Sequence, residues 1–106
     1  MSVALLITKE DDEAHRRLIP VATQQVFRTR WLRGARSLDL PLVASMETGC
    51  RVDVDNRNQL IDELSALRNW MQQEFGAASY DIERLDRLVD ELRLVEFAPG
   101  LEVFVG

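Results

Sequence analysis

The chain has 106 residues and a formal net charge of −5, which results from 13 basic and 18 acidic side chains. Its hydrophobic content of 46% excludes a disordered tail, and its length predicts a single domain over residues 1–106. The single cysteine excludes an internal disulfide, and no apolar run is long enough for a transmembrane helix. Because Met1–Thr8 lacks the basic region and the cleavage site of a signal peptide, we expect a location in the cytoplasm.

The first forty residues predict one strand and one helix. Val3–Ile7 is apolar on both faces, as is typical of a central strand that is covered on both sides. The segment 14–19 fits a short helical turn, and Pro20 favours the start of a longer helix at or after that point. Residues 21–38 then predict a helix with arginines on one side. Its opposite, apolar face carries Phe27, Trp31, Ala35 and Leu38.

Residues 42–54 predict a β-hairpin. A three-residue loop over 48–50 would place similar or complementary side chains opposite each other, which a two-residue turn would not. The pairs in this register are Glu47 with Arg51, Met46 with Val52 and Ala44 with Val54.

The remaining sequence predicts a helical hairpin and a final strand. Residues 56–75 and 80–94 each carry an apolar stripe at helical spacing, and the short connection between them predicts antiparallel packing. Leu101, Val103 and Val105 alternate with Glu102, which is typical of a strand. The predicted order is β-α-β-β-α-α-β. The predicted fold class is α+β, with helices packed against a small, largely antiparallel sheet.

Few side chains offer catalytic chemistry. His15 is the only histidine and Cys50 is the only cysteine, and the two are far apart in the sequence. A cysteine nucleophile needs a base beside it, and no local motif supports such a pair. Asp86 and Asp90 share one side of a helix, where we expect a solvated surface rather than an acid–base pair. We therefore predict no catalytic residue, no metal site and no cofactor, and hence no enzyme.

The charge is divided along the chain, and its basic part is the one candidate for nucleic-acid recognition. Residues 14–36 hold six arginines and no acid, whereas residues 37–106 hold fourteen acids and six arginines. Arginines interleaved with aromatic side chains bind phosphates and stack bases, so a small nucleic-acid-binding regulator is the alternative function. The sequence pI of 4.8 argues against it, and pairing of these arginines with acids of the same chain is the simpler interpretation. The arginines concerned are Arg28, Arg30, Arg33 and Arg36.

The middle of the chain combines a glycine turn, a strand and a leucine-rich helix. These features are carried by Thr48-Gly49-Cys50-Arg51-Val52-Asp53-Val54, followed by Leu60, Glu63, Leu64, Leu67 and Trp70. The combination resembles the immunity proteins of bacterial polymorphic toxins, because in several such families a glycine turn and a strand precede a leucine-rich helix. The resemblance implies a non-catalytic protein that binds one cognate toxin and blocks its active site.

The partner surface that we predict is acidic. Many toxins that act on nucleic acids are basic, so an acidic inhibitor gains in association rate and in complementarity. We expect the contact on the helical hairpin, where a tryptophan ringed by acids has the composition of a binding hot spot. The predicted contact residues are Asp62, Glu63, Trp70, Glu74, Asp86, Asp90 and Glu91. A second copy of the chain is another candidate partner, and a small ligand-binding protein or an enzyme of unknown chemistry is the third hypothesis.

Overall fold

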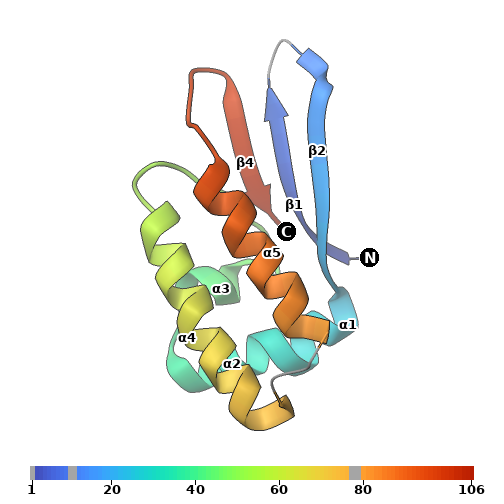
Figure 1. Cartoon of the computed structure of the whole chain (residues 1–106), viewed down its shortest axis with the longest axis vertical. Coiled ribbons are helices and arrows are strands. Elements are labelled where there is room, and N and C mark those ends of the chain that lie inside the picture. Colours follow the sequence, from blue (N-terminus) through green and yellow to red (C-terminus); the bar gives the residue numbers. More distant parts are fainter. Residues whose placement is uncertain (1, 10–11, 77–79) are drawn as a thin grey trace.

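The computed structural model describes residues 2–9, 12–76 and 80–106, and of residues 12–15 it describes the backbone only (Figure 1). The strands are β1 (Ser2–Lys9), β2 (Asp12–Thr23), β3 (Cys50–Val52) and β4 (Leu101–Val105). The helices are α1 (Gln24–Val26), the π-helical turn η1 (Phe27–Trp31), α2 (Leu32–Leu38), α3 (Pro41–Ser45), α4 (Arg57–Phe75) and α5 (Tyr80–Leu94). Since α1, η1 and α2 follow one another without a break, they form one continuous helix. The fold is α+β, as predicted.

The four strands form one antiparallel sheet in the order β2-β1-β4-β3. β1 is a central strand, as its apolar sequence predicts. On one face of the sheet Leu5 lies opposite Ile19, and both side chains are buried against the helices. On the other face Leu18 and Phe104 are exposed. The expectation that β1 is covered on both sides is therefore wrong, because the helices cover a single face.

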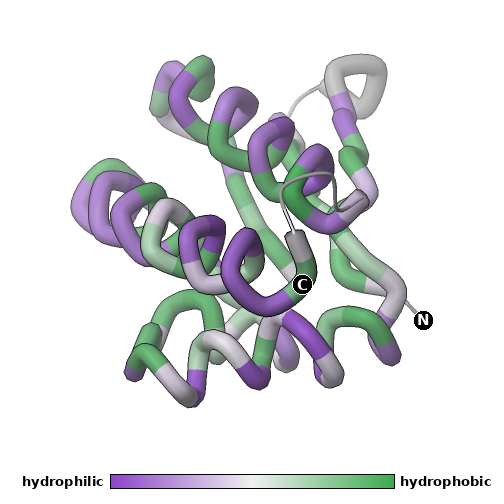
Figure 2. Tube along the Cα trace, turned by 60° about the horizontal axis from the view of Figure 1, so that its bottom comes forward, coloured by the Kyte–Doolittle hydropathy of each residue, from purple (hydrophilic) through white to green (hydrophobic). Residues whose placement is uncertain are grey.

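The helices α4 and α5 form an antiparallel hairpin that lies in front of the rest of the molecule in Figure 1, and this prediction is confirmed. α5 packs against β2, whereas α4 packs against α2 and α3. The hairpin thus covers both the sheet and the shorter helices at the lower end of the sheet. Hydrophobic and hydrophilic residues alternate along both helices (Figure 2), so that one side of each helix joins the core.

The segment 14–19 belongs to β2, so the predicted helical turn is wrong. β2 forms an antiparallel hairpin with β1, in which Leu18 lies opposite Leu6. Pro20 is accommodated because β2 lies at the edge of the sheet, where the outer side of a strand needs no backbone donor. A proline that argued for a helix start in the sequence is therefore an edge-strand proline.

The predicted hairpin over residues 42–54 is also wrong. Its first strand is the helix α3, and its second strand, β3, pairs with β4. In this pairing Val52 lies opposite Val103 and Cys50 lies opposite Val105, so the apolar matching that favoured the hairpin is satisfied by a distant strand. With α1, η1 and α2 counted as one helix, the observed order is β-β-α-α-β-α-α-β.

α3 forms because both of its first backbone N–H groups find an acceptor in α4. Pro41 occupies the first turn, where its fixed φ suits a helix and its missing N–H costs nothing. The backbone N–H groups of Leu42 and Val43 donate to Oε1 of Glu63 at 2.8 and 3.1 Å. A carboxylate at the N-terminus of a helix is favourable both as a hydrogen-bond acceptor and as a negative charge.

The continuous helix of α1, η1 and α2 approaches α4 most closely at Gly34. A Cβ atom on Gly34 would lie 2.5 Å from Cδ1 of Leu67 and 2.6 Å from Cε3 of Trp70.

In a helix interior, alanine is more stable than glycine by about 1 kcal/mol. We nevertheless expect Gly34→Ala to lower the free energy of unfolding by about 1–2 kcal/mol, because the methyl group has no room. Urea denaturation measures the difference, with exposed Ser37→Ala as the control; a stabilised Gly34→Ala chain would contradict this packing.

Candidate functional site

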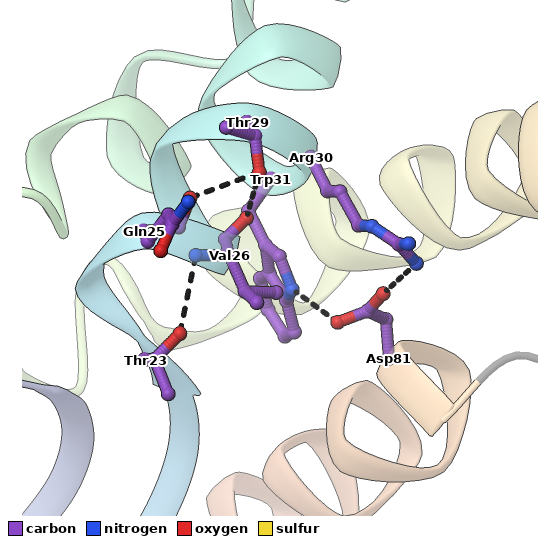
Figure 3. Close-up of polar contacts among 7 residues, drawn as sticks. All are labelled: Thr23, Gln25, Val26, Thr29, Arg30, Trp31 and Asp81. Carbon is purple, nitrogen blue, oxygen red and sulfur yellow. Dashed lines mark hydrogen bonds and ion pairs between the residues drawn. The ribbon is translucent and has the colours of Figure 1, made fainter.

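The helix that follows β2 contains one π-helical turn, η1. In this turn the N–H of Leu32 donates to the carbonyl of Phe27, five residues earlier. The hydroxyl of Thr29 donates to the Gln25 carbonyl at 2.9 Å, which supplies a side-chain donor where the backbone ladder is shifted (Figure 3). π-helical turns are rare and occur frequently at functional sites, so η1 is the first candidate for a functional position.

Asp81, in the first turn of α5, joins α5 to η1 (Figure 3). Its Oδ2 lies 2.8 Å from Nη1 of Arg30, and its Oδ1 accepts a hydrogen bond from Nε1 of Trp31 at 3.4 Å. Asp81 is only 5% exposed and Trp31 is fully buried, so the carboxylate is largely shielded from water. The guanidinium group of Arg30 also lies 4.8 Å from the centroid of the Phe75 ring. These contacts hold the start of α5 against the π-helical turn.

A cavity of about 330 Å³ lies beside this cluster, between β2, α1, η1 and the start of α5. Its wall is apolar along β2 and α1, where Val21, Ala22 and Val26 line it. Its charged and aromatic lining comes from η1 and α5, and consists of Arg30, Tyr80, Asp81 and Arg84. An apolar cavity with a few polar groups is the usual form of a small-molecule site.

Arg84 is held in place in the lining of this cavity. Its Nη1 donates to the Pro20 carbonyl at 3.0 Å, and its Nε donates to the Tyr80 hydroxyl at 2.8 Å. Its guanidinium group lies 4.8 Å from the centroid of the Tyr80 ring. None of the ion pairs among the described residues involves Arg84. Its positive charge is therefore fixed in position by neutral acceptors.

The predicted contact residues on α4 differ in their surroundings. Asp62 is exposed, whereas Glu63 is only 8% exposed and its carboxylate caps α3. Trp70 is half-buried, with the guanidinium group of Arg33 at 5.7 Å from its ring centroid. Glu74 lies on the surface with an oxygen 3.9 Å from Nη2 of Arg33. The Glu63 carboxylate thus points into the molecule and does not lie on a surface that a partner protein could contact.

The predicted contact residues on α5 are partly engaged within the chain. Asp86 pairs with Arg68 at 2.7 Å, and this hydrogen bond, followed by the charge of Asp86, raises the pKa of Arg68 above its ordinary value. Glu91 pairs with Arg17 at 3.0 Å, which ties α5 to β2. Asp90 is exposed. The hairpin therefore offers fewer free carboxylates than its sequence indicates.

The arginines of the candidate nucleic-acid surface pair mostly with acids of this chain, as the intramolecular interpretation predicts. Arg36 is exposed. The other three form the ion pairs Arg28–Glu47 at 3.3 Å, Arg30–Asp81 at 2.8 Å and Arg33–Glu74 at 3.9 Å.

The uncovered face of the sheet carries an apolar row that our sequence analysis missed. Leu18, Leu6 and Phe104 lie opposite one another on β2, β1 and β4, and we call them the sheet-face row. Leu18 is 59% exposed and Phe104 is 40% exposed. The Phe104 ring lies over Gly49, where a Cβ atom would come within 2.3 Å of Cζ. Arg51 lies opposite Phe104 and ends the row. The sequence did contain a signal for the exposure of Phe104. Along β4, Phe104 and Glu102 are two positions apart and so share one face of the sheet, and a glutamate is expected on the exposed face.

The two residues considered for nucleophilic chemistry lie on different strands. Cys50 is buried at the start of β3 rather than in a hairpin loop. His15 lies in β2, and the surroundings of its side chain lie outside the described residues. In the described part of the chain, no group of three or more His, Cys, Asp or Glu side chains is placed to hold a metal ion. No helix in the described ranges combines the length and the hydropathy of a membrane span.

Two features of the described surface thus stand out. One is the cavity beside η1 with the oriented charge of Arg84, and the other is the sheet-face row. Comparisons with models of protein families, with curated proteins and with solved structures found no match to this chain.

Proposed function

We propose that this chain is a non-catalytic protein-binding domain that inhibits a basic partner of the bacterial toxin class by stoichiometric binding. The observation that carries the proposal is the sheet-face row, in which exposed Leu18 and Phe104 flank Leu6. Contiguous exposed apolar side chains bordered by polar ones are typical of protein-binding surfaces. A partly exposed aromatic side chain within such a surface is the type of residue that supplies much of the binding energy. The partner therefore docks on the open face of the sheet.

The charge of the chain defines the kind of partner. The net charge of −5 attracts a basic protein over distance and raises the rate of association. Arg51 and Glu102, whose side chains are both exposed, lie 3.6 Å apart beside the sheet-face row and form a polar rim. The partner that fits is a protein of positive net charge with an apolar docking surface. We therefore propose the contact on the sheet rather than on the helical hairpin, where Glu63, one of the predicted contact residues, is buried.

We expect Phe104→Asp to weaken the complex by about 30-fold or more, because the new carboxylate would be desolvated without a partner. The experiment is co-expression with the product of the neighbouring reading frame, followed by calorimetry on the purified complex and a growth-rescue assay. Leu18→Asp, at the exposed edge strand, tests the same surface with less risk to folding. Leu94→Asp is the matched control, since Leu94 is an exposed leucine near the end of α5, away from the sheet-face row.

The outcomes separate the competing surfaces. Full affinity of Phe104→Asp and Leu18→Asp, with loss of affinity in Asp62→Asn or Asp90→Asn, would place the contact on the helical hairpin instead. If neither a complex nor growth rescue is observed with the native chain, the inhibitor proposal is wrong. If the chain alone forms a dimer that Leu18→Asp dissociates, a second copy occupies the open face and the partner proposal fails for this surface.

A further inference from the structure

We propose that the cavity beside η1 binds a small amphipathic carboxylate, with its apolar part in the cavity and its carboxylate on Arg84. The cavity lies between β2, η1 and the start of α5, whereas the sheet-face row lies on the opposite, uncovered face of the sheet. The proposal therefore concerns a second site and goes beyond the protein-binding function. Three observations carry it, namely the lining of the cavity, its charge balance and the fixed orientation of Arg84.

The lining of the cavity suits a ligand with an apolar body. Its volume of about 330 Å³ falls at the small end of the range for small-molecule sites. Val21, Ala22 and Val26 give it an apolar wall, which favours transfer of a hydrocarbon or aromatic group out of water. Val26 immediately precedes η1 and Arg30 lies within it, so the π-helical turn contributes both apolar and charged lining.

The charge balance of the lining selects a single negative charge. Arg30 and Arg84 bring two positive charges and Asp81 brings one negative charge. Since Arg30 pairs with Asp81 at 2.8 Å, the net positive charge of the lining resides on Arg84. One carboxylate neutralises this charge. A phosphate monoester, which carries up to two negative charges, would leave an excess of negative charge close to Asp81.

The orientation of Arg84 is set before any ligand binds. The Tyr80 hydroxyl accepts hydrogen bonds from its Nε and Nη2, the Pro20 carbonyl accepts one from its Nη1, and the Tyr80 ring lies against the group. These bonds use three of the five guanidinium N–H groups, so one N–H of Nη1 and one of Nη2 remain to donate to the carboxylate of a ligand. A side chain that is already ordered loses less conformational entropy on binding, which raises the affinity for a small ligand.

Calorimetry on the full chain with octanoate, 1-octanol and inorganic phosphate tests the proposal. We expect octanoate to bind. We expect 1-octanol to bind at least about tenfold more weakly than octanoate, because it lacks the negative charge that pairs with Arg84. Inorganic phosphate is expected not to bind. Amide NMR spectra are expected to show octanoate shifts at Val26 and Arg84. Shifts confined to Leu18 and Phe104 would instead show that octanoate adsorbs to the sheet-face row, and would overturn the proposal.

Two variants with a matched control complete the test. Arg84→Gln is expected to weaken octanoate binding by about tenfold or more and to leave 1-octanol unchanged. Arg87→Gln is the control, since Arg87 is exposed one turn further along α5. If Arg84→Gln does not fold, Ala22→Leu narrows the cavity from β2 and is expected to abolish binding of both compounds. Equal weakening by Arg84→Gln and Arg87→Gln, or no octanoate binding at about 1 mM, would overturn the proposal without affecting the inhibitor proposal.

Discussion

Replacing Trp31 with alanine is expected to lower the free energy of unfolding by about 3–5 kcal/mol. Trp31 is the largest of the fully buried side chains, and its ring centroid lies 6.2 Å from that of Phe27. The substitution removes this packing, opens a cavity in the core, and deletes the Nε1–H donor that bonds Asp81. Domains of this size are stable by about 5–15 kcal/mol, so the loss is a large fraction of the total. Urea denaturation followed by circular dichroism measures it.

Two further tryptophan variants separate packing from hydrogen bonding. Trp31→Phe keeps most of the apolar volume but lacks the donor to Asp81, so we expect a smaller loss of about 1–2 kcal/mol. Trp70→Ala is the matched control, because Trp70 is only half-buried. Equal losses for Trp31→Ala and Trp70→Ala would contradict the central position of Trp31 in the core.

Replacing Glu63 with alanine is expected to lower the free energy of unfolding by about 2–3 kcal/mol. The Glu63 carboxylate accepts hydrogen bonds from the N–H groups of Leu42 and Val43, and its other oxygen accepts one from Gln59 Nε2 at 3.0 Å. Without it, the buried N–H of Val43 and the half-buried N–H of Leu42 lose their acceptor, and α3 loses its cap. Thermal and urea denaturation measure the change, and Glu63→Gln is expected to retain part of the stability because it keeps one acceptor oxygen.

The neighbouring acid provides the control for Glu63. Asp62 is exposed, and Asp62→Ala is expected to change the free energy of unfolding by less than about 0.5 kcal/mol. The pair also distinguishes the two roles considered for Glu63. Should Glu63→Ala leave stability unchanged and weaken the complex with a partner, Glu63 would be a contact residue, as the sequence predicts, and the capping role would be wrong.

The elements that could be predicted are those whose pattern repeats within their own residues. α4, α5 and β4 carry apolar residues at a fixed spacing and β1 is a continuous apolar run, so neighbouring sequence is enough to identify them. The burial of Phe27, Trp31 and Ala35 also follows from their spacing on one helix, and the structure confirms it. Here local propensity and final packing agree. Leu38, expected on the same face, is exposed at the end of α2, so that part of the prediction is wrong.

The elements that could not be predicted are fixed by distant partners. α3 has only five residues, and its cap comes from Glu63, twenty residues or more along the chain. β2 loses its simple alternation because Arg17 lies on the helix-facing side of the sheet and pairs with Glu91 of α5. Neither contact can be recognised from the neighbouring residues in the sequence. Short-range patterns therefore favoured a helical turn over residues 14–19 and a hairpin over residues 42–54.

The candidate site beside η1 was hidden for the same reason. Trp31 and Asp81 are separated by fifty positions in the sequence, and Arg84 and Pro20, which share a hydrogen bond, are separated by sixty-four. The π-helical turn itself has no sequence signature beyond the hydroxyl of Thr29, which bonds the carbonyl of Gln25. The acids that the sequence singled out on the helical hairpin did not include Asp81, which joins that hairpin to the first helix through Arg30 and Trp31.

The position of β4 between β1 and β3 has a consequence for the order of folding. In the described chain β3 pairs with no strand other than β4. Because Cys50 of β3 lies opposite Val105 of β4, a loop of more than fifty residues must close before β3 joins the sheet. Contacts over such separations form slowly, whereas the β1–β2 hairpin and the helices form from nearby residues. Insertion of β4 is thus expected to be a late step. Since β4 supplies Phe104, the sheet-face row is assembled only then. A partly folded chain therefore lacks the surface on which we propose that a partner docks.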